Sequence, residues 1–390
     1  MANKNAGVNA VVNGVVEPEF EAVLDAFAGN FDRHDEVGAA CAVYVDGRLV
    51  VDLWGGRADP TTDTAWREDT LALVYSCTKG MSATCANLLI ERGLLDPDAT
   101  VAKYWPEFAA NGKDAITVRQ VLSHQAGLAV IEGDLTLEEC LSWFPVVEAI
   151  AKQAPIWEPG TAHGYHMRAF GWLVGELVRR ITGRTIGTFW RDEVAAPLDL
   201  SFWIGLPEEL EPRVAQLVPP KADLRAFFAS LGDDVLLGRA TTGPSGHFAY
   251  DDMWNRRALH ACELPSSNGI GDARSLARLY ASLIGAVDGV RTLQPKTVEA
   301  ATRVQVRGPD KVILTDTAFG LGYMLPPSLN PRCRPDAFGH AGAGGSLAFA
   351  DPKAGFAFAY VMNDLRFDLR GDPRSESLVE ATYRSLEAAG

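Results

Sequence analysis

The sequence LALVYSCTKGMSATCANLLIERGLLDPD, residues 71–98, changes from a short apolar run into a long helical pattern. Its first six residues are typical of a short strand that leads into a helix. In the helix, apolar or small side chains recur at steps of three and four residues, as at Met81, Cys85 and Leu88, and Gly93 is suited to the helix end. Because almost every face of this helix is apolar, we predict that it lies at the centre of the fold.

Segments rich in β-forming residues lie far from this helix, near both ends of the chain. Residues 39–59, AACAVYVDGRLVVDLWGGRAD, hold two such runs around Asp46-Gly47, a pair typical of a two-residue hairpin turn. Residues 346–364, SLAFADPKAGFAFAYVMND, predict two more strands, and residues 375–390 predict a closing helix. We therefore expect early and late strands to pair in one mainly antiparallel sheet.

The middle of the chain, residues 101–265, reads as mostly helical or irregular. Helical patterns occupy residues 116–128, 136–153 and 167–183, with Gly and Pro between them. Residues 219–265 carry Pro219-Pro220 and several aromatic residues, and we predict an irregular segment that forms a pocket wall or lid.

The order of these elements predicts an α+β fold with two parts. An α/β domain of residues 1–100 and 266–390 holds the antiparallel sheet and its flanking helices, including an amphipathic helix within residues 271–287. The mostly helical residues 101–265 are inserted as a second lobe. The cleft between the two parts is the expected ligand site.

The composition excludes several classes of protein. Of 390 residues, 47% are hydrophobic and 22% charged, as in soluble globular proteins, and 36 Lys+Arg against 50 Asp+Glu give a net charge of −14. This charge argues against nucleic acid or an anionic membrane as partner. The sequence has no run of about 18 apolar residues, so we predict no membrane span. Its first 20 residues lack the continuous apolar core of a secretory signal. We expect a monomer or a small homo-oligomer.

The six cysteines show no C-x-x-C spacing, so we predict reduced, mostly buried thiols and a cytoplasmic location. His163 and His166 are three positions apart, but no third ligand is near in sequence. We therefore predict no metal site and no cofactor.

Ser76-Cys77-Thr78-Lys79 fits the pattern S-x-x-K. Positions i and i+3 share one face of a helix, so the Lys79 amine can approach the Ser76 hydroxyl. A serine hydroxyl is a weak nucleophile until a base takes its proton, and a desolvated lysine near a helix N-terminus has its pKa lowered toward that role. Alternatively, Ser76 only caps its helix. The tetrad alone does not decide between the two.

Two further stretches support the catalytic interpretation. WEPGTAHGYHMRAFGWLVGEL (157–177) places Tyr165 shortly after Pro159-Gly160, and FGHAGAGGSLAFADP (338–352) is a glycine-rich entry to a strand. With S-x-x-K, and with VLSHQAGL (121–128) and NGIGDARSLARLYA (268–281) in the same order, the chain resembles the penicillin-recognising serine hydrolases. These include class C β-lactamases, D-alanyl-D-alanine peptidases and family VIII carboxylesterases, and the resemblance covers roughly residues 20–385.

The resemblance implies a set of site residues. Ser76 matches the nucleophile, Lys79 its partner and Tyr165 the second general acid/base, while His340-Ala341-Gly342 matches the third motif. The backbone N–H groups of Ser76 and Ala343 would form the oxyanion hole. The predicted substrate-binding residues are His340, Gly342, His166, Phe248 and Trp254, the last two because they lie in the irregular segment.

Two departures from the β-lactamase pattern point toward esters. The tyrosine motif Y-x-N reads Tyr165-His166-Met167 here, and the third motif begins with His340, largely neutral near pH 7, where β-lactamases have Lys. A fixed cation for a substrate carboxylate is therefore missing. Both departures match family VIII esterases, and we predict a serine carboxylesterase for short-chain or small neutral esters.

Three alternatives remain. A β-lactamase or a D-alanyl-D-alanine peptidase-like amidase would use the same residues, and a catalytically silent binding protein would use none of them. The α/β-hydrolase fold is rejected, because the elbow G-x-S-x-G is absent from the sequence.

Overall fold

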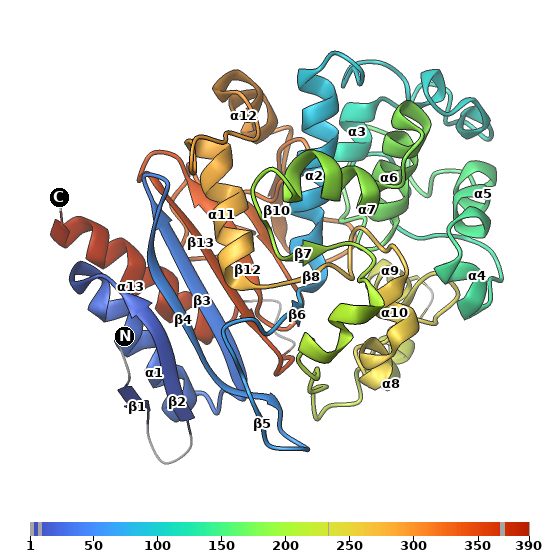
Figure 1. Ribbon diagram of the computed structural model, residues 1–390. Helices are drawn as coiled ribbons and strands as arrows, with labels where there is room; N and C mark the ends of the chain where they lie inside the picture. The colour runs from blue at the N-terminus through green and yellow to red at the C-terminus, as the bar shows by residue number, and fades with distance from the viewer. Residues whose placement is uncertain (1–3, 7–9, 233, 367–370, 390) are drawn as a thin grey trace.

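The computed structural model describes residues 4–6, 10–232, 234–366 and 371–389. Its main sheet is antiparallel, in the order β1-β2-β4-β3-β13-β12-β11, with β5 added to β4 (Figure 1). The strands are β1 (Lys4–Ala6), β2 (Ala10–Val16), β3 (Gly38–Val45), β4 (Arg48–Asp59), β5 (Thr64–Ala65), β11 (Phe338–Ala341), β12 (Leu347–Asp351) and β13 (Phe356–Met362). Strands from both ends of the chain meet where β3 pairs with β13, which confirms the predicted α+β fold.

Both predicted pairs of strands are present. Asp46 and Gly47 join β3 to β4 with φ angles of 48° and 77°, and two positive φ angles in a two-residue turn match the right-handed twist of a hairpin. Strands β12 and β13 pair from Leu347 with Tyr360 to Asp351 with Phe356. The turn residues and the runs of β-forming residues were therefore sufficient to predict these strands.

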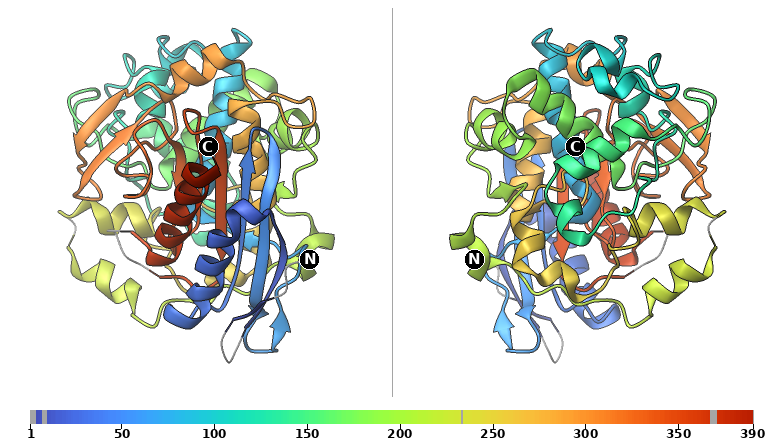
Figure 2. Two further views of the ribbon diagram at one scale, coloured as in Figure 1. Left: turned by 90° about the vertical axis from the view of Figure 1, so that its left-hand side faces the viewer. Right: turned by 90° about the vertical axis from the view of Figure 1, so that its right-hand side faces the viewer.

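Helices cover both faces of the main sheet. α1 (Glu21–Arg33) and the closing helix α13 (Pro373–Ala389) pack on one face, and α11 (Ala273–Ile284) packs on the other (Figures 1 and 2). Asp272 is the N-cap of α11, and its carboxylate accepts the N–H of Ser275 at 2.7 Å. This cap stabilises the first turn of the predicted amphipathic helix.

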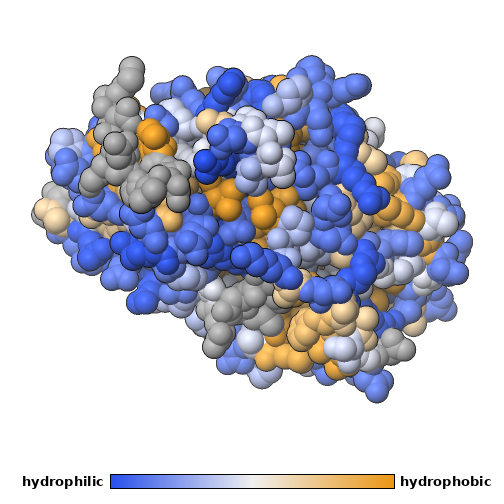
Figure 3. All heavy atoms as spheres, turned by 90° about the horizontal axis from the view of Figure 1, so that it is seen from below, coloured by the Kyte–Doolittle hydropathy of each residue, from blue (hydrophilic) through white to orange (hydrophobic). Residues whose placement is uncertain are grey.

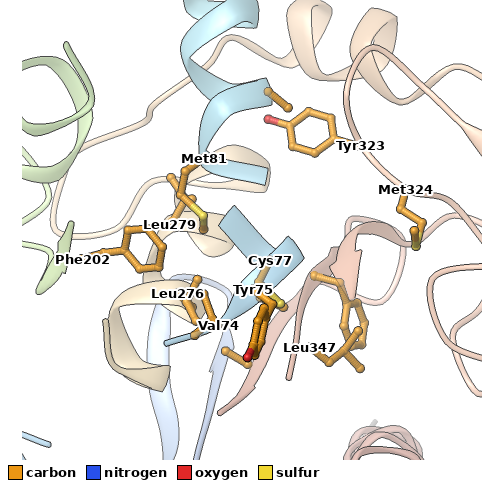
Figure 4. Close-up of a cluster of buried hydrophobic side chains, with 14 of the residues drawn as sticks. Val74, Tyr75, Cys77, Met81, Phe202, Leu276, Leu279, Tyr323, Met324 and Leu347 are labelled. Atoms are coloured by element: carbon orange, nitrogen blue, oxygen red, sulfur yellow. The ribbon is translucent and has the colours of Figure 1, made fainter. Parts of the chain in front are cut away.

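The helix predicted at the centre of the fold is α2 (Thr78–Glu91), and residues 78–89 are all buried. Gly93 follows it with a φ of 69°, the left-handed conformation that suits a residue after a helix end. Figure 4 shows Cys77 and Met81 in one cluster of buried apolar side chains with Leu276 and Leu279 of α11. The apolar face of α11 thus links the sheet to α2.

The middle of the chain is helical, with shorter elements than the sequence predicted. Its helices are α3 (Val118–Leu122), α4 (Leu137–Leu141), α5 (Phe144–Lys152), α6 (Ala169–Thr182), α7 (Ile186–Trp190), α8 (Leu224–Ser230), α9 (Leu236–Thr242) and α10 (Arg257–Ala261). The single helix expected over residues 136–153 breaks at Trp143, where φ is 74°, two residues before Pro145. Residues 219–265, predicted to be irregular, hold α8, α9 and α10, which are too short for helical periodicity to be recognised.

Smaller elements connect these parts. β6 (Ala72–Leu73), β8 (Ile270–Gly271) and β7 (Phe202–Trp203) form a short sheet beside the entry to α2. α12 (Pro295–Thr302) precedes a hairpin of β9 (Val306–Pro309) and β10 (Asp316–Phe319). The division of the chain at residues 100 and 265 stays a prediction.

The helices, the cysteines and the surface add three observations. Across the described residues, no helix combines the length and the apolar character that crossing a bilayer requires. The six cysteines are free thiols, and four of them are buried. Seen from below, the surface is mainly hydrophilic and is interrupted by apolar patches (Figure 3).

Candidate active site

Ser76 stands on a strained turn between a strand and a helix. β6 ends at Leu73, and Tyr75, with a φ of 44°, turns the chain into a 3-10 turn that continues as α2. A positive φ at an aromatic residue is strained and needs support from its surroundings. The Tyr75 ring lies edge-on to the rings of Tyr250 and Trp254, with centroids 5.3 and 5.1 Å away. Ser76 is therefore held, half-buried, at the start of α2, where the helix dipole favours negative charge.

Lys79 lies one turn further along and is fully buried. Its Nζ is 3.1 Å from Ser76 Oγ, 2.6 Å from the Met167 carbonyl oxygen and 2.9 Å from the Ser266 carbonyl oxygen. Carbonyl oxygens only accept hydrogen bonds, so each of the two must receive an N–H from Nζ. A neutral amine has two N–H groups and one lone pair, and the lone pair then faces the Ser76 hydroxyl. This is the geometry of a base that can take the serine proton.

The surroundings of Lys79 favour that neutral form. Burial lowers the pKa of Lys79 well below its usual value, and the positive charge of Arg168 lowers it further. Among the described residues, no carboxylate forms an ion pair with Lys79 that would restore the proton. A lysine depleted of its proton at neutral pH can act as a general base.

Tyr165 brings a phenol from the segment before α6. Its ring centroid lies 4.8 Å from Lys79 Nζ, and the ring stacks on Phe319 at 5.9 Å. The hydroxyl is buried and has no hydrogen-bond partner within the described part of the chain. Burial raises the pKa of Tyr165 well above its usual value, with the nearby Ser76 hydroxyl acting in the opposite direction. The phenol therefore stays protonated and can donate a proton.

Asp310 fixes the backbone of Tyr165. Both oxygens of its carboxylate lie 3.0 Å from the Tyr165 N–H. The same carboxylate accepts the N–H groups of Val312 and Ile313, at 2.8 and 3.0 Å, and the hydroxyl of Thr317 at 3.1 Å. Hydrogen bonds to a buried carboxylate are among the stronger ones. Asp310 thus ties the tyrosine segment to the loop that follows β9.

The turn after β11 approaches the Ser76 segment closely. The Gly342 N–H donates to the Ser346 carbonyl at 2.7 Å, and the Ser346 hydroxyl donates to the Val74 carbonyl at 3.0 Å. A Cβ added to Gly342 would lie 2.2 Å from Ser346 Oγ and 2.3 Å from the Val74 carbonyl oxygen, so this position has no room for a side chain. Ser76 and Ala343, whose N–H groups are the predicted oxyanion donors, both line the cavity at this point.

A cavity of about 360 Å³ lies between these segments, with Ser76, Tyr165 and Gly342 in its wall. Apolar side chains form much of the remaining wall: Met167, Ile313, Met324, Pro327, Leu329, Pro331 and Leu347. Among the described lining residues the one cation is Arg366, and its guanidinium pairs with Asp364 at 2.8 Å. In the part of the chain described here, no group of three or more His, Cys, Asp or Glu residues could hold a metal ion.

Two predicted aromatic residues lie behind the cavity wall. Phe248 and Trp254 are fully buried and pack on Arg168, whose guanidinium carbon lies 5.1 Å from each ring centroid. Tyr250, which the sequence did not single out, lines the cavity instead. The irregular segment therefore contributes to the wall as predicted, but through a different side chain.

The two predicted histidines are also buried and do not line the cavity. His166 accepts the Leu128 N–H at 3.1 Å, and its other ring nitrogen lies 2.7 Å from the Gly164 carbonyl. His340 contacts the Ala341 carbonyl at 2.7 Å. Burial lowers the pKa of His166 to about 4 and that of His340 to about 3. Both rings are neutral at physiological pH, and their contacts fit a structural role.

Comparisons with known proteins place the chain among relatives with similar sequences and folds. The family model described as Beta-lactamase matches residues 20–381. The protein named Esterase/beta-lactamase LipL from Mycobacterium tuberculosis is 38% identical over 362 residues, which cover 91% of this chain and 83% of that protein. A crystal structure of a family VIII carboxylesterase is 39% identical, with a TM-score of 0.88, and the match covers 96% of this chain and 99% of that one. EstA from Arthrobacter nitroguajacolicus is 33% identical, with a TM-score of 0.85 and full coverage of both chains.

Proposed function

Since the chain belongs to the β-lactamase family and its relatives are named as esterases and hydrolases, we propose that it is a serine carboxylesterase for small neutral esters. One observation carries the proposal. Lys79 Nζ lies 3.1 Å from Ser76 Oγ, while its two N–H groups are taken by backbone carbonyls. In its neutral form the amine is therefore oriented to accept the proton of Ser76.

In the proposed acylation step, Ser76 Oγ forms a bond to the ester carbonyl carbon as its proton passes to Lys79. The electron pair of the carbonyl moves to oxygen, and the backbone N–H groups of Ser76 and Ala343 stabilise the negative charge. When the intermediate collapses, the bond to the alcohol oxygen breaks. Tyr165 donates a proton to the departing alkoxide and regains one from the Lys79 ammonium.

Deacylation uses the same groups in reverse. Water attacks the acyl carbon and passes its proton to the Lys79–Tyr165 pair, and Ser76 leaves with a proton to restore the free enzyme. No cofactor takes part in the proposed steps. In this scheme each proton that leaves one oxygen is taken up at another, by way of Lys79 and Tyr165.

The charges around the cavity support neutral substrates. His340 stands where β-lactamases carry a lysine, and with a pKa of about 3 it is uncharged at neutral pH. Arg366 is the one cation among the described residues of the wall, and its guanidinium is already paired with Asp364. A substrate carboxylate would therefore lose its water shell without gaining a cation, which is costly.

The size of the cavity supports short acyl groups. Its volume of about 360 Å³ is near the lower limit of typical ligand sites. The apolar wall formed by Ile313, Met324 and Leu329 suits a hydrocarbon chain.

The free thiols agree with a reducing compartment, so a cytoplasmic location is part of the proposal.

The proposal is tested with the purified protein on p-nitrophenyl esters of increasing chain length. We expect hydrolysis that falls as the acyl chain grows, and near-complete loss of turnover in Ser76→Ala. Ser282→Ala is the matched control, because it removes another buried serine hydroxyl, on α11, away from the cavity. Unchanged turnover in Ser76→Ala would exclude the proposed mechanism.

A second candidate, β-lactam hydrolysis, is suggested by the name of LipL, Esterase/beta-lactamase. Nitrocefin tested beside p-nitrophenyl butyrate separates the two activities. We expect kcat/KM for the ester to exceed that for nitrocefin, and the reverse order would make the β-lactamase assignment the better one.

A further inference from the structure

Arg168 is a buried cation that has no carboxylate partner within the described part of the chain. It is 3% exposed, its Nε donates to the Thr241 carbonyl at 2.8 Å, and its Nη1 donates to Ser267 Oγ at 3.1 Å. Its Nη2 has no hydrogen-bond partner among the described residues. Arginine is almost never fully buried unless it is paired with an anion. An uncompensated charge at this position therefore needs an explanation.

Aromatic rings surround the guanidinium of Arg168. Its carbon lies 5.1 Å from the centroids of Phe248 and Trp254 and 5.8 Å from that of Tyr250. Cation–π contacts stabilise a buried cation. Unlike a carboxylate, the rings carry no net charge, so they leave the positive charge of Arg168 uncancelled.

The same arginine belongs to the framework that holds Lys79. The carbonyl of Met167, the residue before Arg168, accepts one N–H of Lys79, and the Ser266 carbonyl accepts the other. The Ser266 hydroxyl donates to the Arg168 carbonyl at 2.8 Å, while Arg168 Nη1 contacts Ser267. Arg168 therefore joins the two chain segments that orient the amine.

We propose that Arg168 is a positioning residue that keeps Lys79 in its neutral, proton-accepting form through the repulsion of an uncancelled buried charge. The inference rests on the proposed function. A second cation on Lys79 would be held by the same two segments as the first, and among the described residues no carboxylate forms an ion pair with either, so protonation of Lys79 is disfavoured. The charge of Arg168 ranks directly after burial among the causes that lower the pKa of Lys79.

The other titratable groups near the two cations do not compensate this repulsion. Cys77, Tyr165, His124 and His340 face Lys79. Burial raises the pKa values of the thiol and the phenol and lowers those of both imidazoles, so all four stay neutral. The groups that face Arg168 are phenols: Tyr75, Tyr165 and Tyr250. When kcat/KM is plotted against pH, protonation of Lys79 therefore sets the acid limb, the range in which the rate falls as the pH is lowered.

The test is the pH dependence of kcat/KM for p-nitrophenyl butyrate between about pH 5 and pH 9. In Arg168→Gln the acid limb should move to higher pH by about one unit, which is a tenfold loss of rate on that limb. Ser267→Ala removes a hydrogen bond of Arg168 but keeps its charge, so its limb should stay in place. A Ser267→Ala limb that moves as far as that of Arg168→Gln would assign the effect to structure and overturn the proposal.

Two measurements keep the test decisive. Ser267→Asp places a carboxylate beside Arg168 Nη1 and should move the acid limb to higher pH, so the test remains possible if Arg168→Gln does not fold. If the acid limb stays in place in either folded variant, the inference is overturned. The rate at which a fluorophosphonate labels Ser76 across the same pH range reports the Ser76–Lys79 pair without ester turnover. A wild-type protein that is labelled but hydrolyses no ester would refute the proposed function and still test Arg168.

Discussion

Gly342→Ala tests whether the close approach of the turn after β11 to the Ser76 segment is required for activity. The added methyl group would lie 2.3 Å from the Val74 carbonyl oxygen, and Cβ contacts below 3.0 Å essentially do not occur. The Ser346 hydroxyl, at 2.2 Å, can rotate away, but the Val74 carbonyl is backbone and also accepts the Cys77 N–H at 3.1 Å. One of the two segments must therefore shift by roughly 1 Å, and a shift of that size at a reacting centre costs about 100-fold in rate.

The assay for Gly342→Ala is kcat/KM with p-nitrophenyl butyrate, measured together with thermal unfolding. We expect a loss of about 100-fold in kcat/KM and about 1–3 kcal/mol in unfolding free energy from overpacking. Gly285→Ala is the matched control, because its added Cβ would meet its nearest atom only at 3.8 Å. Neither glycine has a positive φ, so backbone strain does not enter the comparison. Turnover of Gly342→Ala within a few-fold of wild type would refute the reasoning.

Three further substitutions probe separate contacts. Tyr165→Phe should lower kcat by about 10²–10⁴ with an alkyl ester and less with a p-nitrophenyl ester, whose leaving group needs no proton; equal losses would exclude Tyr165 as the donor. Asp310→Asn replaces one acceptor of the Tyr165 N–H by an NH₂ group and should lower kcat about tenfold with KM little changed, whereas a change in KM alone would contradict a positioning role. Glu176→Ala, away from the cavity, should cost about 3 kcal/mol in urea unfolding and leave kcat unchanged. Burial raises the pKa of Glu176, but hydrogen bonds, led by that from Arg179, outweigh burial and lower the pKa overall. The contribution of Glu176 to the free energy of unfolding is therefore present above the usual glutamate pKa and is lost as the pH falls below it. If the difference in unfolding free energy between wild type and Glu176→Ala grows as the pH is lowered, the stabilising role of the ionised Glu176 is contradicted.

Local signals in the sequence were sufficient for two features that depend on near neighbours. Ser76 and Lys79 are in contact because a helix brings positions i and i+3 to one face. Asp46-Gly47 predicts the hairpin for a similar reason, since a two-residue turn with positive φ selects such residues. Tyr165 was found only through its place in an ordered set of motifs. Nothing in its own neighbourhood indicates that it meets Lys79.

Side-chain contacts between distant segments could not be predicted. Asp310 binds the backbone of Tyr165 across 145 positions, and no pattern near either residue signals it. Tyr250 lines the cavity while Trp254 lies behind it, because side-chain direction in an irregular segment follows from packing and not from spacing. Strand β2, which lies between β1 and β4, was missed for another reason: its outward residues are exposed, Val11 at 49%, so it lacks the buried run that identifies a central strand.

The arrangement around Lys79 links catalytic power to the stability of the fold. In the unfolded chain this amine holds its proton at neutral pH, whereas in the folded protein burial and Arg168 lower its pKa. Wherever the unfolded state binds more protons than the folded state, the free energy of unfolding falls as the pH is lowered, so a neutral Lys79 lowers stability at physiological pH. Met167 and Ser266, which take its two N–H groups, lie on different segments, and their carbonyls offset part of this cost only while both stay in place. The base therefore exists only in the assembled site, and a change that loosens either segment should reduce activity before it unfolds the protein.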